Sequence, residues 1–552
     1  MAKLLEFENF SASFGDQRAV RNLNLALQQG EFLALVGESG CGKSITALSA
    51  MRLAPENARL SGAIRYQGRD LLSAPAATVR GLRGNEISMI FQEPMTSLNP
   101  VLTIGQQLTE TLRCHRAISG RAARQQAIDL LDRVNIPHAA RRVDDYAHHF
   151  SGGQRQRIMI ALAVACEPKL LIADEPTTAL DVTVQQQILS LLDRLRHELK
   201  MGVLFITHDL GLVEQRADRV AVMYQGQKVE ENSKTALFHQ PKHAYSRGLL
   251  AASLHSMEAP HYLSQRLTEI VHQPEAAPRL ITPPLRSFAP LNRLAPPLLQ
   301  LEDVSFNYAA DSGSAGVKNI SLTLQPGETL GLVGESGCGK STLSKLILRL
   351  LTPDSGKIWL DGHEIAQWRS AQLAPLRQRM QMVFQDPYAS LNPRHTIEEI
   401  LTTPLRVHRP ESRASHAQSV RQVLDQVGLP QSALKRLPHA FSGGQRQRIG
   451  IARALIVDPA LLICDEPVSA LDVSVQAQIL NLLVDLKHER QLSLLFISHD
   501  LAVVKYIADR VMVMYQGETV EQGDHQQIWH QPQHPYTRQL LQSLAGRREA
   551  AA

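Results

Sequence analysis

The sequence predicts an α/β fold that occurs twice in one chain, as two tandem domains. A glycine-rich loop, Gly-Glu-Ser-Gly-Cys-Gly-Lys-Ser, is present at residues 37–44 and again at 334–341. Each copy follows a short apolar run, at 32–36 and 329–333, of the kind that forms a buried strand. A helix-compatible stretch follows each loop, so the local order is strand, loop, helix. The sequence therefore predicts a duplicated P-loop domain, in which the P-loop is this glycine-rich, phosphate-binding loop.

The repeat extends well beyond the loops. Lys340 lies 297 residues beyond Lys43, and four later residues lie 291 beyond their first-half counterparts. These later pairs are Ser151 and Ser442, Asp174 and Asp465, His208 and His499, and His239 and His530. A repeat of this length consists of whole domains rather than solenoid units. We expect a first domain at 1–255 and a second at 299–552.

The segment between the two domains, residues 256–298, contains a cluster of prolines and loses the periodic pattern. Proline at this density disfavours both helix and central strand. The segment is interpreted as an extended, semi-rigid linker that serves as a spacer.

Composition narrows the class of protein. The 552 residues exceed what one hydrophobic core holds, and 44% hydrophobic with 20% charged residues is typical of a soluble globular protein. No apolar run reaches the roughly 18 residues of a membrane helix, and acidic residues come too early for a signal peptide. The five cysteines lack paired spacing, which favours a reducing cytoplasm. A net charge of +5 without a basic run gives no support for nucleic-acid binding.

The glycine-rich loops match the phosphate-binding pattern, in which backbone amides and the start of a helix face the anion. We expect Lys43 and Lys340 to contact the β- and γ-phosphates, and the hydroxyls of Ser44 and Ser341 to bind Mg²⁺. The predicted nucleotide-binding residues of the two loops are Gly37, Glu38, Ser39, Gly40, Cys41, Gly42, Lys43 and Ser44, and Gly334, Glu335, Ser336, Gly337, Cys338, Gly339, Lys340, Ser341 and Thr342.

Two acidic residues follow a buried-strand pattern in each half, at the end of residues 170–175 and 461–466. We expect Asp174 and Asp465 to hold Mg²⁺ through water. Glu175 and Glu466 can then orient or deprotonate the attacking water. A capped helix start is the structural alternative, but it does not explain a repeat downstream of both P-loops.

A histidine follows a later apolar strand in each half, 34 residues beyond the predicted magnesium aspartate. His208 and His499 lie at the carboxyl end of their strands, which is the ligand edge of an open α/β sheet. This position favours a contact with the γ-phosphate. Gln92 and Gln385 would be unremarkable alone, and they indicate a functional role only together with the other repeated motifs.

The segment Ser-Gly-Gly-Gln precedes a long helical pattern in each half. Its residues are Ser151, Gly152, Gly153 and Gln154 in the first half, and Ser442, Gly443, Gly444 and Gln445 in the second. Such a helix start is a second anion site beside the P-loop. A second anion site in each half is explained if each nucleotide binds between the two halves.

These motifs and their order resemble the ATP-binding cassette family. The resemblance implies ATP hydrolysis with Mg²⁺, and in each domain a RecA-like core, an antiparallel β subdomain and a helical signature subdomain. It also implies that the cassettes pair head to tail within the chain, with each P-loop opposite the other's Ser-Gly-Gly-Gln signature. Gln92 and Gln385, like His208 and His499, would be catalytic residues beside Glu175 and Glu466. The two glutamines would also join the magnesium ligands, and Phe14 and Tyr308 would stack on adenine. The Ala-Leu-Asp turns, Ala179-Leu180-Asp181 and Ala470-Leu471-Asp472, complete the set.

Narrower features are similar to the peptide and nickel importer branch. They are Ser-Leu-Asn-Pro at 97–100 and 390–393, and the tails at 239–245 and 530–536. The resemblance implies two membrane permease subunits, a periplasmic substrate-binding protein, and a peripheral place at the cytoplasmic face of the bacterial inner membrane. Phe150 and Phe441 stand where the wider family has leucine, and Ala244 replaces the proline found at Pro535. Neither tail has the cysteine cluster of some relatives, so no iron–sulfur cluster is expected.

The expected cargo is a peptide or a peptide-like compound such as microcin C, with nickel and glutathione as alternatives. A soluble twin-cassette ATPase acting on ribosomes or DNA would carry a charged helical linker or zinc-spaced cysteines. A fused sugar importer would usually have one degenerate site. A further hypothesis is that modification of Cys41 or Cys338 blocks ATP binding, although small side chains that fit the loop explain them equally well.

Overall fold

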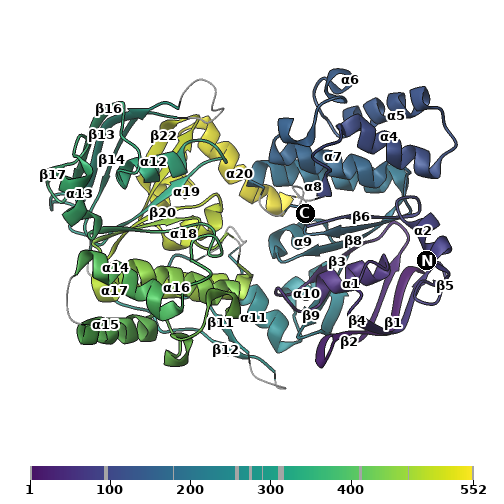
Figure 1. Cartoon of the computed structure of the whole chain (residues 1–552), viewed down its shortest axis with the longest axis horizontal. Helices are drawn as coiled ribbons and strands as arrows, with labels where there is room; N and C mark the ends of the chain where they lie inside the picture. The colour runs from purple at the N-terminus through teal and green to yellow at the C-terminus, as the bar shows by residue number, and fades with distance from the viewer. Residues whose placement is uncertain are drawn as a thin grey trace. The chain divides into compact units, whose positions relative to one another are not determined.

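The computed structural model divides the chain into two compact units. The first contains Met1–Leu250, His272–Arg279 and Arg547–Ala552, and the second contains Ala251–Val271 and Leu280–Gly546. The structure describes residues 3–92, 97–177, 180–254, 260–272, 277–288, 290–308, 316–409, 413–469 and 471–549. The two units are shown in Figure 1, and each is described by itself.

A six-stranded sheet forms the centre of the first unit, in the order β10-β9-β3-β8-β7-β6. The strands β3, β6, β7, β8 and β9 run parallel, and β10 pairs antiparallel with β9. Every residue of β3 and β7 is buried, as expected of parallel strands covered on both faces. The bounds are β3 (Phe32–Val36), β6 (Ile87–Ile90), β7 (Leu170–Asp174), β8 (Gly202–Thr207), β9 (Arg219–Tyr224) and β10 (Gln227–Ser233).

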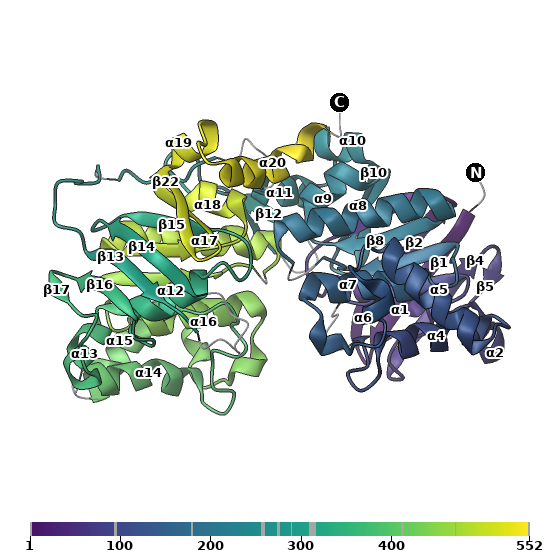
Figure 2. The same cartoon turned by 90° about the horizontal axis from the view of Figure 1, so that it is seen from above.

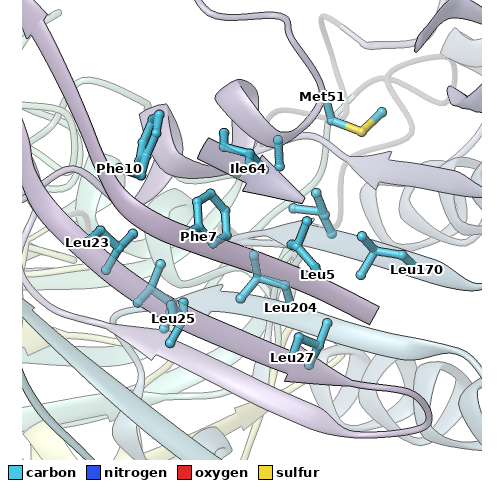
Figure 3. Close-up of a cluster of buried hydrophobic side chains, with 14 of the residues drawn as sticks. Leu5, Phe7, Phe10, Leu23, Leu25, Leu27, Met51, Ile64, Leu170 and Leu204 are labelled. Atoms are coloured by element: carbon cyan, nitrogen blue, oxygen red, sulfur yellow. The ribbon is translucent and has the colours of Figure 1, made fainter. Parts of the chain in front are cut away.

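A smaller antiparallel sheet, in the order β2-β1-β4-β5, packs beside this core. Its bounds are β1 (Lys3–Phe14), β2 (Gln17–Gln28), β4 (Ala58–Tyr66) and β5 (Arg69–Asp70). One buried cluster joins both sheets: Leu5, Phe7 and Phe10 from β1 meet Leu170 and Leu204 of the parallel sheet (Figure 3). The helix α1 (Lys43–Ala50) adds Ala47 and Ala50 to the same cluster. The P-loop that precedes α1 is thus carried by a continuous core.

A helical group completes the first unit. It contains α4 (Ile104–His115), α5 (Gly120–Arg133) and α7 (Gly152–Val164), which contact one another (Figure 1). A capping box begins α4: the Thr103 hydroxyl accepts from the Gln106 amide, and the Gln106 side chain accepts from the Thr103 amide. The further helices that the structure describes up to residue 252 are α2 (Ala76–Leu82), α6 (Ala139–Arg142), η1 (Ala147–His149), α8 (Val182–Leu199), α9 (Leu210–Arg216), α10 (Lys234–His239) and α11 (Ala244–Ala252).

The second unit repeats this architecture. Its sheets have the orders β18-β19-β20-β15-β21-β22 and β14-β13-β16-β17. Its strands are β13 (Leu299–Phe306), β14 (Val317–Leu324), β15 (Thr329–Val333), β16 (Ser355–Leu360), β17 (His363–Glu364), β18 (Met380–Val383), β19 (Leu461–Asp465), β20 (Ser493–Ile497), β21 (Arg510–Tyr515) and β22 (Glu518–Asp524). The predicted duplicated α/β fold, with its antiparallel and helical parts, is confirmed.

The helices of the second unit follow the same order as those of the first, and α14, α15 and α16 form its helical group (Figure 2). The bounds are α12 (Lys340–Ile347), α13 (Ser370–Arg377), α14 (Ile397–His408), α15 (Arg413–Gln426), η2 (Gln431–Ala433), η3 (Pro438–Ala440), α16 (Gly443–Leu455), α17 (Val473–Arg490), α18 (Leu501–Ile507), α19 (His525–His530) and α20 (Pro535–Glu549). Among the described residues, no helix is long and apolar enough to cross a membrane.

Part of the segment predicted to be a spacer packs against the second unit. We call residues 260–271 the strap; it ends in β11 (Glu269–Val271), and β12 (Arg279–Ile281) follows. Arg266, whose side chain is 1% exposed, donates to Asn481 and Asp485 of α17. Tyr262 is buried as well and donates to Asp509 at 2.6 Å. The strap is therefore an integral part of the core of the second unit.

Candidate functional site

The two P-loops have matching geometry. The ammonium Nζ of Lys43 donates to the carbonyls of Gly37 and Glu38, at 2.7 and 2.9 Å. In the second unit the corresponding distances from Lys340 are 2.7 and 2.8 Å. Gly42 and Gly339 cap α1 and α12 with φ of 102° and 104°, a region that glycine adopts without strain. Each loop thus presents a buried ammonium group at a helix start, which suits a chain of phosphates.

Two of the three predicted magnesium residues lie next to each other in each unit, while Gln92 and Gln385 contact the following glutamates. The hydroxyl of Ser44 lies 3.3 Å from Oδ1 of Asp174, and the hydroxyl of Ser341 lies 3.4 Å from Oδ1 of Asp465. Burial raises the pKa of Asp174 to about 6, and it also raises the pKa of Asp465. A hydroxyl beside a buried carboxylate is a set of hard oxygen donors that fits Mg²⁺. A bound Mg²⁺ ion would supply positive charge to the phosphates of ATP there.

The glutamates that follow these aspartates are held by two side chains each. In the first unit, Gln92 donates to Oε2 of Glu175 at 3.0 Å, and Nδ1 of His208 lies 3.3 Å from Oε1. In the second unit, the corresponding distances to Glu466 are 2.8 Å from Gln385 and 3.0 Å from His499. The three predicted catalytic side chains therefore meet at one carboxylate in each unit. That carboxylate is fixed from both sides and can accept a proton from an attacking water.

Both glutamates have an unusual backbone. Glu175 has φ of 47° and Glu466 has φ of 48°, in the left-handed region that costs energy for residues other than glycine. Their amides donate to the carbonyls of Ile206 and Ile497, each at 2.9 Å, and this hydrogen bond holds the strained residue at the strand end. The chain turns sharply after the aspartate, so the two neighbouring carboxylates take different directions.

The glutamate and histidine of the second unit influence each other's ionisation. Burial disfavours the charged form of each, but their mutual hydrogen bond and charge outweigh it. The pKa of Glu466 is therefore below its ordinary value, and the pKa of His499 is above its ordinary value. The ionised carboxylate is the form that can serve as a base.

The signature segments begin α7 and α16, as predicted. Ser151 and Ser442 cap these helices, each through a capping box with the glutamine three residues later. The second glycine of each segment is a packing requirement: a Cβ on Gly153 would lie 2.6 Å from Val184, and one on Gly444 would lie 2.2 Å from Val475. The helix start is therefore pressed against the following helix, and its first two residues are glycines that carry no side chain.

The remaining predicted residues are placed as follows. Phe14 ends β1. The hydroxyl of Tyr308 lies 3.4 Å from that of Thr342 at the start of α12. Ala179 and Ala470 lie outside the described residues, while Asp181 caps α8 through the amide of Val184 at 2.9 Å.

Sequence reasoning missed a contact that the tail motifs make with the P-loops. The hydroxyl of Tyr245 accepts a hydrogen bond from the amide of Glu38 at 3.1 Å. The hydroxyl of Tyr536 accepts one from the amide of Glu335 at the same distance. The only available signal was the repeat of the tails at a spacing of 291 residues. The pattern indicated that the tails matter without indicating what they contact.

The cysteines permit a labelling test of the thiol hypothesis. Cys41 and Cys338 are buried, burial raises the pKa of Cys338, and Cys114 is exposed. Because a buried thiol is poorly accessible and forms little thiolate, we expect a maleimide to modify Cys114 first and Cys338 at least about tenfold more slowly. Mass spectrometry of peptides from the native protein measures both rates, with Cys114→Ser as the control. Equal labelling rates for Cys114 and Cys338 would support the hypothesis that modification of the P-loop thiols blocks ATP binding.

Two P-loops, two acidic pairs and two signature helices on this fold define the chain as an ATPase of the ATP-binding cassette class. The family model described as ABC transporter matches residues 20–178 and 317–469. The model described as Oligopeptide/dipeptide transporter, C-terminal region, matches 229–279 and 520–551. The chain belongs to the ABC transporter family, as an ATP-hydrolysing protein with two cassettes.

Curated relatives align over nearly the whole chain. The Uncharacterized ABC transporter ATP-binding protein YejF of Escherichia coli is 48% identical, over 98% of this chain and 99% of that protein. The Glutathione import ATP-binding protein GsiA is 45% identical in Pectobacterium atrosepticum and 46% in Escherichia coli, each over 98% of this chain and 89% of that protein. These alignments include both halves of this chain.

Proposed function

We propose that this chain supplies the energy for a bacterial importer of peptides or peptide-like compounds such as microcin C. The observation that carries the proposal is the tail of each cassette, since both tails match the oligopeptide/dipeptide transporter model. The chain works with membrane permease components, as ATP-binding subunits of this family do. We infer two permease subunits, a periplasmic substrate-binding protein delivering the cargo, and a location at the cytoplasmic face of the inner membrane.

The proposed domains are 1–255 and 299–552, joined by 256–298, and the strap within the joining segment packs into the second unit. Each ATP lies between the P-loop of one cassette and the signature of the other. Lys43 and Lys340 bind the phosphates, Ser44, Gln92, Asp174, Ser341, Gln385 and Asp465 hold Mg²⁺, and Glu175 and Glu466 act as bases. Because the γ-phosphate contacts both halves only in the closed state, binding favours closure and hydrolysis favours opening.

Glutathione is the second candidate cargo, because relatives that align along most of their length are named for its import. Glutathione is itself a peptide-like compound, so the same tails suit it. Nickel remains an outcome of the test.

An uptake assay tests the proposed function. A strain lacking this gene should lose uptake of labelled di- and oligopeptides, and the full-length protein should restore it. The Glu175→Gln/Glu466→Gln double variant, whose side chains keep the size of glutamate, is the matched control and should restore none. Loss of glutathione or nickel uptake alone would change the cargo, and unchanged uptake of all three would favour a soluble twin-cassette role.

A further inference from the structure

The tail of each cassette reaches back to its own P-loop through one tyrosine. Tyr245 at the start of α11 is 0% exposed, and Tyr536 at the start of α20 is 7% exposed. Each hydroxyl accepts the amide of the first residue after the loop's leading glycine, at 3.1 Å. The ring of Tyr245 stacks on Tyr224 at 4.4 Å, and that of Tyr536 lies 4.3 Å from Tyr515.

The tail itself is held at a fixed position. In the first unit the carboxylate of Glu230 accepts the amides of Lys242 and His243, both at 2.9 Å, and Nδ1 of His243 accepts the amide of Tyr245 at 3.2 Å. In the second unit Glu521 accepts the amides of Gln533 and His534, at 2.7 and 3.0 Å, and His534 accepts that of Tyr536 at 3.2 Å. The same three hydrogen bonds therefore occur in both units, and they are made by residues at matching positions of the tail motif.

The amide that donates a hydrogen bond to each tyrosine lies next to the carbonyls that accept hydrogen bonds from the P-loop lysine. Lys43 donates to the carbonyls of Gly37 and Glu38, so the peptide joining these residues carries both the lysine contact and the tyrosine contact. Fixing the amide therefore fixes the direction of the carbonyl in the same peptide plane. Without the hydroxyl, a part-buried amide loses its partner, which costs free energy that rotation of the peptide can recover.

We propose that Tyr245 and Tyr536 are positioning residues that hold the two P-loops in the conformation that binds ATP, so that each tail acts on its nucleotide site. The tails would therefore influence nucleotide affinity. The catalytic glutamates directly follow β7 and β19 and are held by the glutamine and the histidine of their own unit, so the expected effect is on nucleotide binding rather than on turnover.

The test uses the full chain with one P-loop silenced at a time. Tyr245→Phe is combined with Lys340→Ala, and Tyr536→Phe with Lys43→Ala, and the Kd of a fluorescent ATP analogue is measured for the remaining loop. We expect the Kd to rise about tenfold in each case, since phenylalanine keeps the ring but leaves the amide unpaired. In the otherwise unmodified chain, the KM for ATP should rise with little change in kcat.

Tyr515→Phe is the matched control, because the hydroxyl of Tyr515 accepts from Gln516 and does not reach the P-loop. It should leave the Kd unchanged. If both phenylalanine variants at 245 and 536 bound ATP as the parent chains do, the proposal would be overturned, whatever happened to their melting temperatures.

An independent observation concerns the first P-loop alone. Nε2 of His272 lies 3.1 Å from Oε2 of Glu38, and its Nδ1 lies 3.1 Å from the hydroxyl of Tyr224. Glu38 is 15% exposed, and its other oxygen, Oε1, is buried with no hydrogen-bond partner among the residues that the structure describes. We infer that protonated His272 offsets the negative charge of the Glu38 carboxylate next to the phosphate site. Protonation of His272 therefore favours ATP binding to the first P-loop.

The groups that face His272 are Glu38 of the P-loop and Tyr224 of β9, with Tyr245 of α11 stacked behind Tyr224. The hydrogen bond and charge of Glu38 outweigh burial and raise the pKa of His272 above 6.5. A raised pKa means that the contact is strongest below pH 6.5 and is weakened as the pH rises through the folded-state value. The repulsion between Glu38 and the phosphates then increases.

The Kd of the fluorescent ATP analogue should be measured from pH 6.0 to 8.5 in the Lys340→Ala chain, with and without His272→Gln. We expect Kd to rise about threefold more with pH in the parent than in the glutamine variant, which keeps a neutral donor. Because ATP itself titrates in this range, the Lys43→Ala chain serves as the control, and His272→Gln should leave its curve unchanged. Identical curves for parent and variant at the first P-loop would refute the inference.

Discussion

Replacing both Glu175 and Glu466 with glutamine should lower kcat for ATP hydrolysis by about 100-fold or more, the usual contribution of a general base. Glutamine keeps the size of the side chain and can remain between Gln92 and His208, or between Gln385 and His499, but it cannot accept the proton of water. ATP affinity should stay near that of the parent chain, so kcat falls with little change in Kd. Phosphate release and equilibrium nucleotide binding measure the two quantities.

The single variants address the equivalence of the sites. Because the distances around the two glutamates agree within about 0.3 Å, we expect Glu175→Gln and Glu466→Gln to lower kcat by similar factors, each to half or less. Glu328→Gln provides a control, since this buried glutamate accepts the amide of Gln325 away from the nucleotide site. A single variant with the parent kcat would mean that only the other site turns over.

Replacing Arg266 with alanine should destabilise the second unit by about 2 to 3 kcal/mol, because a buried side chain and its hydrogen bonds are lost. The guanidinium makes four hydrogen bonds at 2.9 to 3.1 Å, two to Asp485 and two to Asn481. Its loss removes all four of these bonds of a buried side chain, although Asp485 keeps Arg286 and Asn481 keeps the amide of Leu267 and the hydroxyl of Tyr506.

The chain offers a selective signal for this measurement. Its three tryptophans, Trp359, Trp368 and Trp529, all belong to the second unit, so their fluorescence during urea unfolding reports that unit. The matched control is Arg286→Ala: Arg286 contacts the same carboxylate at 3.1 Å but is 40% exposed, so we expect a loss of at most about 1 kcal/mol. Equal unfolding midpoints for Arg266→Ala and the parent chain would contradict a structural role for the strap.

Much of the site was predictable because its residues stand beside strong local signals. The runs at 32–36 and 329–333 form β3 and β15 with those bounds, and Asp174 and Asp465 end their strands. Glycines, a lysine and an acidic pair at the ends of parallel strands are brought together by the topology of the sheet itself. Each prediction of this kind needed only a short stretch of sequence.

The features that escaped prediction depend on distant parts of the chain. Arg266 stands in a proline-rich stretch with no periodicity, and its partners on α17 lie more than 200 residues away. Tyr245 meets Glu38 across 207 residues. The left-handed backbone of Glu175 has no signature in residue type, since glutamate rarely adopts it. Tertiary contacts determine all three.

The strap also decides where this chain can be divided. A break between Leu254 and Pro260 would give a carboxyl-terminal piece that retains Tyr262, Arg266 and their partners on α17 and near β21. A break near residue 298, where the repeat of the sequence begins again, would remove the arginine from a carboxylate that it neutralises. Separate expression of the two halves therefore calls for the upstream junction, because the strap folds as the opening segment of the second half, and this cut separates the first unit from His272 and its contact with Glu38.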